Sequence, residues 1–154
     1  MRVISYILLF VSAGILMSCE KPDTVIEDND PKYAGVMTVR YEGEDFVQKD
    51  IKVQAGFSED STSVDIKLLK VKFVPAMPVR IDVTVMEVPV VRTEDGDFGF
   101  YGDGIVPWAM GGPYDTYRVD GLQGRISDGE LEFSMTFYNT KKQEGYPTSY
   151  DGTR

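Results

Sequence analysis

The feature that most constrains this chain is a two-residue alternation of apolar and polar side chains. Residues 131–138 show it most clearly, because Leu, Phe, Met and Phe occupy every second position and Glu, Ser, Thr and Tyr lie between them. Successive side chains of a β-strand point to opposite faces, so this pattern predicts a strand with one buried face. No apolar stripe at helical spacing extends beyond about two turns. The chain is therefore predicted to be all-β.

Similar segments recur between residues 33 and 140, separated at intervals of about 8–12 residues by turn sequences such as Asp95-Gly96 and Asp128-Gly129. There are roughly eight such segments. Strands joined in sequence order by short turns favour an eight-stranded antiparallel up-and-down β-barrel over residues 33–140. Residues 141–154 are mostly polar, which predicts a loose C-terminal tail.

Two segments within this region carry more specific predictions. The apolar face of residues 63–74 changes phase at Leu68-Leu69, which predicts a β-bulge there, with a short helical turn as the alternative. Residues 79–85 predict a strand on which Val79 faces inward. Residues 88–93 predict a separate strand, which Pro89 restricts to an edge or a bend.

The N-terminal segment has the pattern of a signal peptide. Arg2 precedes an apolar run over residues 3–17, which is short for a membrane-spanning helix of about 20 residues. The run ends in Leu16-Met17-Ser18-Cys19, which resembles a bacterial lipobox. It predicts a lipoprotein signal peptide over residues 1–18, cleavage before Cys19, and acylation of Cys19 as the attachment to the membrane. Residues 19–32 are rich in Asp and Glu and predict a flexible acidic tether.

The composition excludes several function classes. The chain has no histidine and one cysteine, so histidine-dependent nucleophilic triads and zinc sites built from His and Cys are excluded. A net charge of −9 argues against nucleic acid as a partner. Asp95 and Asp97 lack the further ligands of a calcium loop and predict a turn instead. We expect no enzyme activity, no cofactor and no metal.

Two stretches carry a resemblance to a known family. Lys32 to Val39 reads Lys-Tyr-Ala-Gly-Val-Met-Thr-Val and follows the acidic tether as an opening strand. Val119-Asp120-Gly121 through Asp128-Gly129-Glu130 to Met135 forms a closing hairpin. These stretches resemble the calycin-like β-barrel family of Bacteroidetes lipoproteins. The resemblance implies an eight-stranded calycin-like barrel and an outer membrane lipoprotein, periplasmic or surface-exposed. Met37 stands where true lipocalins have the Trp of their Gly-x-Trp signature.

The predicted inward side chains are bulky, and they suggest two hypotheses about function. An eight-stranded barrel is just wide enough to be filled by side chains or to hold one small ligand. In the first hypothesis the barrel binds a small apolar or amphipathic ligand. In the second it has no ligand cavity and is a structural or protein-interaction lipoprotein that uses its outer face and loops. Trp108 is expected either to line the barrel mouth or to plug the barrel end. The candidate lining residues are Met37, Phe100, Trp108, Tyr117, Phe133, Met135 and Phe137.

Overall fold

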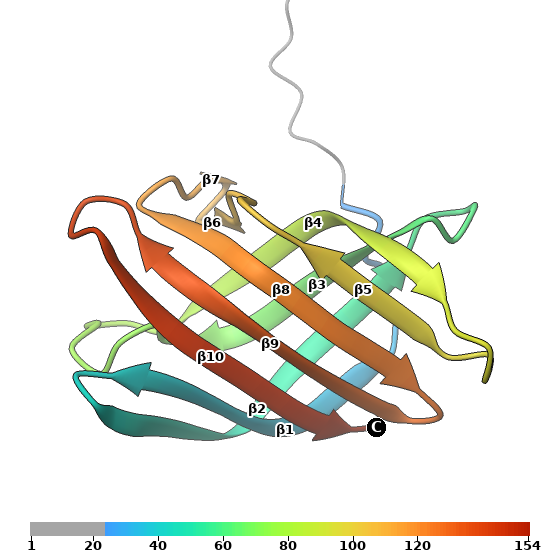
Figure 1. Ribbon diagram of the computed structural model, residues 1–154, viewed down its shortest axis with the longest axis horizontal. Coiled ribbons are helices and arrows are strands. Elements are labelled where there is room, and N and C mark those ends of the chain that lie inside the picture. The colour runs from blue at the N-terminus through green and yellow to red at the C-terminus, as the bar shows by residue number, and fades with distance from the viewer. Residues whose placement is uncertain (1–23) are drawn as a thin grey trace, which may run out of the picture.

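The computed structural model describes residues 24–154, and the predictions for the signal peptide and Cys19 lie outside these residues. Figure 1 shows the strands wrapped around one closed core. The ten strands are β1 (Lys32–Tyr41), β2 (Glu44–Phe57), β3 (Ser63–Val71), β4 (Ile81–Arg92), β5 (Phe98–Gly102), β6 (Trp108–Ala109), β7 (Gly112–Pro113), β8 (Tyr117–Ser127), β9 (Glu130–Asn139) and β10 (Glu144–Thr153).

Eight of these strands close into an antiparallel up-and-down barrel, as predicted. Their order is β3-β2-β1-β10-β9-β8-β5-β4, and β3 also pairs with β4, so the eight strands form a ring in which the first strand, β1, meets the last, β10. The short β6–β7 hairpin pairs with β4 through Val83↔Ala109 and Thr84↔Trp108. Within residues 24–154, no helix has the length and apolar character needed to cross a membrane.

The bulge predicted at Leu68-Leu69 is confirmed. Leu68 pairs with Val83 but Val71 pairs with Ile81, so β3 carries one residue more than β4 over this interval. Lys70 lies inside the bulge with a positive φ of 53°. The extra residue lets Val64, Ile66 and Leu68 share the buried face with Val71 and Phe73 despite the change of phase.

Two predictions for the next segment are wrong. Val79 is 59% exposed and precedes β4, because the chain enters the sheet only at Ile81. Residues 88–93 are not a separate strand, since β4 continues to Arg92. Glu87 takes a positive φ of 55°, and this irregularity keeps Val88 buried after the alternation shifts.

The prediction of a loose tail over residues 141–154 is also wrong. Residues 144–153 form β10, which pairs with β9 on one side and with β1 on the other. Its inward side chains are Tyr146, Thr148 and Tyr150, all nearly inaccessible to solvent. The alternation is present in the sequence, but it uses tyrosine and threonine in place of aliphatic residues. The barrel therefore extends to Thr153.

The Tyr150 side chain links the last strand of the barrel to β1 and β2. Its hydroxyl lies 3.0 Å from the carbonyl oxygen of Tyr33 on β1 and 3.0 Å from that of Ile51 on β2. Burial raises the pKa of Tyr150, so the hydroxyl keeps its proton and remains a donor. One buried side chain thus links β10 to two further strands at the seam that closes the barrel.

Replacing Tyr150 by Phe is expected to lower the free energy of unfolding by about 1–3 kcal/mol, because buried carbonyl oxygens lose their donor. Urea denaturation followed by circular dichroism measures this change. Tyr101→Phe is the matched control, since Tyr101 is 57% exposed and its hydroxyl can bond to water. Equal stability of the two variants would contradict the role assigned to Tyr150.

Candidate functional site

The barrel interior is filled by its own side chains. Six of the seven predicted lining residues are at most 5% exposed: Met37, Phe100, Tyr117, Phe133, Met135 and Phe137. Phe133 stacks on Tyr150 with ring centroids 5.1 Å apart. Aromatic contacts at this spacing occupy the space that a ligand would need.

Phe73 plugs one end of the barrel, the role that the sequence suggested for Trp108. It follows β3 in the chain and is fully buried. Its ring centroid lies 4.3 Å from that of Tyr117 and 4.1 Å from that of Phe137. Two of the predicted lining residues therefore pack directly on this plug.

Trp108 lies on the outer face of the barrel. Its neighbour Ala109 pairs with Val83 and is buried, so the opposite pair, Thr84 and Trp108, points outward. The cross-strand row continues from Thr84 to Lys67 on β3 and then to Gln54 on β2. The structure thus brings six of the predicted residues together in the core and separates Trp108 from them.

A groove of about 470 Å³ opens on the outer face between β1 and the start of β4. Its lining is strongly basic, although the chain carries a net charge of −9. The cationic side chains in the lining are Lys32, Lys49, Lys52, Lys70 and Arg80. Asp50 and Asp82 also line it, so the groove has an excess of positive charge. We call this the basic groove.

Two bulges concentrate the cations in the basic groove. On β2, Lys49 and Asp50 form a bulge opposite β1, where the register shifts between Gly35 and Met37. On β3, the bulge at residues 69–70 brings Lys70 to the same region. A bulge bends its strand and redirects the side chains it carries. The sequence predicted the β3 bulge but gave no reason to link it with a site.

Hydrogen bonds between Arg80, Gln48 and the backbone hold the wall of the basic groove in place. Arg80 donates from Nη1 to Oε1 of Gln48 at 3.1 Å and to the carbonyl oxygen of Lys70 at 3.3 Å. Gln48 is 3% exposed and accepts a further hydrogen bond from the Lys72 backbone N–H. The ion pairs within residues 24–154 involve Arg40, Arg118 and Arg125, so none of them uses a cation of the basic groove.

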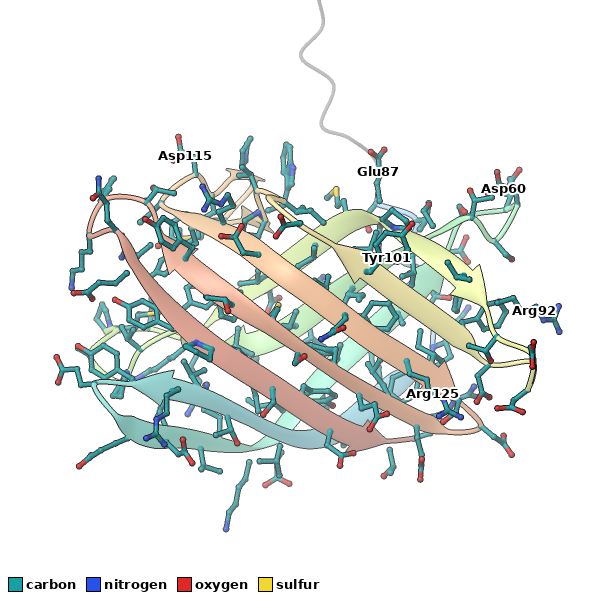
Figure 2. The ribbon with its side chains drawn as sticks, viewed as in Figure 1. Asp60, Glu87, Arg92, Tyr101, Asp115 and Arg125 are labelled. Carbon is teal, nitrogen blue, oxygen red and sulfur yellow. The ribbon has the colours of Figure 1, made fainter. Side chains whose placement is uncertain are left out.

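A second groove, of about 510 Å³, is mainly apolar. Met86, Pro89, Tyr101, Ile105 and Leu122 contribute its apolar side chains, and Glu87 and Asp103 line it with carboxylates. Tyr101 is 57% exposed, which is high for an aromatic residue beside other apolar groups. Figure 2 shows Glu87 at the upper edge of the barrel with Tyr101 below it. We call this the Tyr101 groove.

Residues 24–30 form a strap over the outside of β2 and β3. The buried carboxylate of Asp65 accepts hydrogen bonds from the Thr24 hydroxyl at 3.0 Å and the Val25 backbone N–H at 3.1 Å. Its other oxygen accepts from the Glu87 backbone N–H at 2.8 Å. The described part of the predicted flexible tether is therefore attached to the barrel.

Gly56 provides the space in which the strap lies. A Cβ at this position would come within 2.7 Å of the Asp30 carboxylate and 3.0 Å of the Ile26 Cα. Gly56 also pairs with Asp65 across β2 and β3, so the contact surface and the anchoring carboxylate are adjacent. Close packing of the strap requires glycine here.

The turn predicted at Asp95 and Asp97 is confirmed. The Thr93 N–H donates to the carbonyl oxygen of Asp97, and Gly96 has a φ of 84°. The Asp97 carboxylate forms an ion pair with Arg125 on β8. Its charge is therefore used to attach the β4–β5 turn to a neighbouring strand.

Gly56→Ala is expected to release the strap while leaving the barrel folded, because the added methyl group meets the Asp30 carboxylate and the Ile26 Cα of the strap. Amide hydrogen exchange at residues 24–30 should rise, with much smaller changes at β8 and β9. Gly99→Ala is the control, since a Cβ there meets nothing closer than 3.6 Å. Unchanged exchange in the strap of the Gly56 variant would show that the strap does not depend on this contact.

Comparisons with known proteins support the fold. No protein-family model and no curated protein sequence matches the chain. The chain is similar in structure to a "putative outer membrane protein" from Bacteroides fragilis, with a TM-score of 0.59 and 19% sequence identity. The match covers 82% of this chain and 51% of the other, so the chain spans about half the length of that protein. At this identity the likeness is one of fold.

Proposed function

We propose that this chain is an outer membrane lipoprotein, anchored through acylated Cys19, whose barrel is a protein-interaction module. In this proposal the basic groove binds an acidic segment of a partner. The lipobox-like Leu16-Met17-Ser18-Cys19 supports the anchor. The observation that carries the interaction site is the excess of cations in the basic groove of an acidic chain.

The filled interior favours the outer face over an internal ligand site. The predicted lining residues contact one another and the Phe73 plug, so an internal ligand would have to displace well-packed aromatic rings. The basic groove needs no such rearrangement, because it is already open. Its wall is supported by Gln48 and Arg80, which lowers the cost of ordering the site when a partner binds.

Charge complementarity sets the chemistry of the partner. The cations of the basic groove attract Asp and Glu side chains, while the acidic remainder of the chain repels them. An acidic partner would therefore be guided toward this face. Because exposed charges are screened by salt, the interaction should weaken as ionic strength rises.

The anchor is tested by intact mass measurement of the mature protein extracted from bacterial membranes. The expected mass is that of a chain beginning at residue 19 with added acyl groups, because cleavage at the lipobox leaves the acylated cysteine as the first residue. Cys19→Ala should leave the precursor uncleaved. A mature wild-type chain that starts elsewhere or lacks acyl groups would overturn the lipoprotein proposal.

The groove is tested by calorimetric titration with a poly-glutamate peptide. Lys49→Ala, Lys52→Ala and Lys70→Ala combined should weaken binding by about tenfold, since each exposed ion pair contributes about 0.2–1 kcal/mol. Lys141→Ala with Lys142→Ala is the control, because both lysines are exposed and lie outside the basic groove. Equal losses in both variants would indicate binding by net charge alone and would contradict the site.

A further inference from the structure

We infer that the Tyr101 groove and the outer face around Trp108 rest on the lipid bilayer that holds the chain. This inference depends on the proposed anchoring through Cys19. It concerns a surface distinct from the basic groove and a partner of different chemistry, a phospholipid surface. The argument starts from where the strap enters the barrel.

The strap fixes the entry point of the chain beside the Tyr101 groove. Asp65 holds Thr24 and Val25 through one carboxylate oxygen and the Glu87 backbone through the other. Glu87 and its neighbour Met86 line the groove. In Figure 1 the start of the described chain lies at the upper edge of the barrel, on the side of β4. The Asp65 carboxylate therefore binds both the first described residues and the backbone of a residue that lines the groove.

The distance to the anchor is short. Four residues lie between Cys19 and Thr24, and even a fully extended chain over this interval spans only about 18 Å. An acyl group on Cys19 lies in the bilayer, so Thr24 and Asp65 must stay within about this distance of the lipid surface. The face around Asp65 and Glu87 is therefore the part of the barrel held closest to the membrane.

That face carries the side chains suited to a lipid interface. Tyr101 is 57% exposed above the apolar groove, and Val25 in the strap is 40% exposed. Trp108 points outward beside Thr84, two residues before Met86 on β4. Tyr and Trp are enriched at membrane interfaces because their rings combine an apolar body with a polar group. Lys67, opposite Thr84, can extend its ammonium group toward lipid phosphates.

The carboxylates at the groove also define the lipid. Glu87 and Asp103 line the Tyr101 groove, and like charge would repel an anionic surface. Zwitterionic headgroups avoid this repulsion. Phosphatidylcholine vesicles are therefore the appropriate probe, and adding anionic phosphatidylglycerol should weaken contact at this face.

Trp108 is the only tryptophan in the chain, so its fluorescence reports the contact without a label. The acylated full-length mature protein is reconstituted in phosphatidylcholine vesicles containing brominated acyl chains, which quench nearby indole rings. We expect loss of about half or more of the Trp108 emission, because interfacial side chains lie within about 5–10 Å of the acyl boundary. Tyr101→Ser should restore most of the emission. Val91→Ser is the matched control, since Val91 is 53% exposed outside the groove, and it should leave the quenching unchanged.

Moving the probe tests the orientation of the barrel. In a Trp108→Phe, Val47→Trp protein the tryptophan lies on β2 near the β1–β2 hairpin. Figure 1 shows this hairpin at the lower edge of the barrel and β6 and β7 at the upper edge. Its emission should be unaffected by brominated lipid. Quenching as strong at residue 47 as at residue 108, or none at either, would overturn the inference. Acylation is read by mass in the same samples, so a missing anchor is distinguished from an anchored barrel that does not dock.

Discussion

Closure of the barrel between β1 and β10 is the constraint on which the rest of the structure depends. An open sheet would leave two rows of unpaired backbone groups, whereas the ring pairs every strand on both sides. The seam brings Gly35 opposite Gly152, and a Cβ on Gly35 would come within 2.0 Å of the Asp151 carbonyl oxygen. The two glycines allow the close approach, and the Tyr150 hydroxyl fixes it from inside.

The sequence predicts the strands with an aliphatic or aromatic buried face, but it does not predict the strand at the seam. Leu131 to Phe137 alternates with aliphatic and aromatic residues, and it forms β9 as expected. The seam strand β10 has the same period, but Tyr146, Thr148 and Tyr150 carry polar groups that make the segment read as a tail. Their hydroxyls are acceptable in the core because each has a partner: Glu144 for Tyr146, the Tyr146 carbonyl for Thr148, and two carbonyls for Tyr150. Such partners come from tertiary structure and cannot be read from local pattern.

The candidate site shows the same division. The inward residues Met37, Phe133 and Phe137 follow from period two alone, and the structure buries them. The outward direction of the Trp108 side chain does not follow from period two, because it depends on how a two-residue strand pairs with β4. The sequence did not predict the basic groove, because a net charge of −9 is a sum over the whole chain and does not reveal a local cluster of cations. The spacing of Lys67, Lys70 and Lys72 was visible, but only the bulges of β2 and β3 bring Lys70 together with Lys49.

A consequence of the strap concerns mechanical force. Any pull on the chain before Thr24 acts first on the Asp65 carboxylate, which lies in the interior of β3 between two paired neighbours. The load then passes to the β4 backbone through Glu87 and spreads over several strands. Without the strap, the same pull would act on Lys32 at the end of β1 and peel that strand from β10 one hydrogen-bonded pair at a time. Asp65 thus diverts a pulling force away from the β1–β10 seam that keeps the barrel closed.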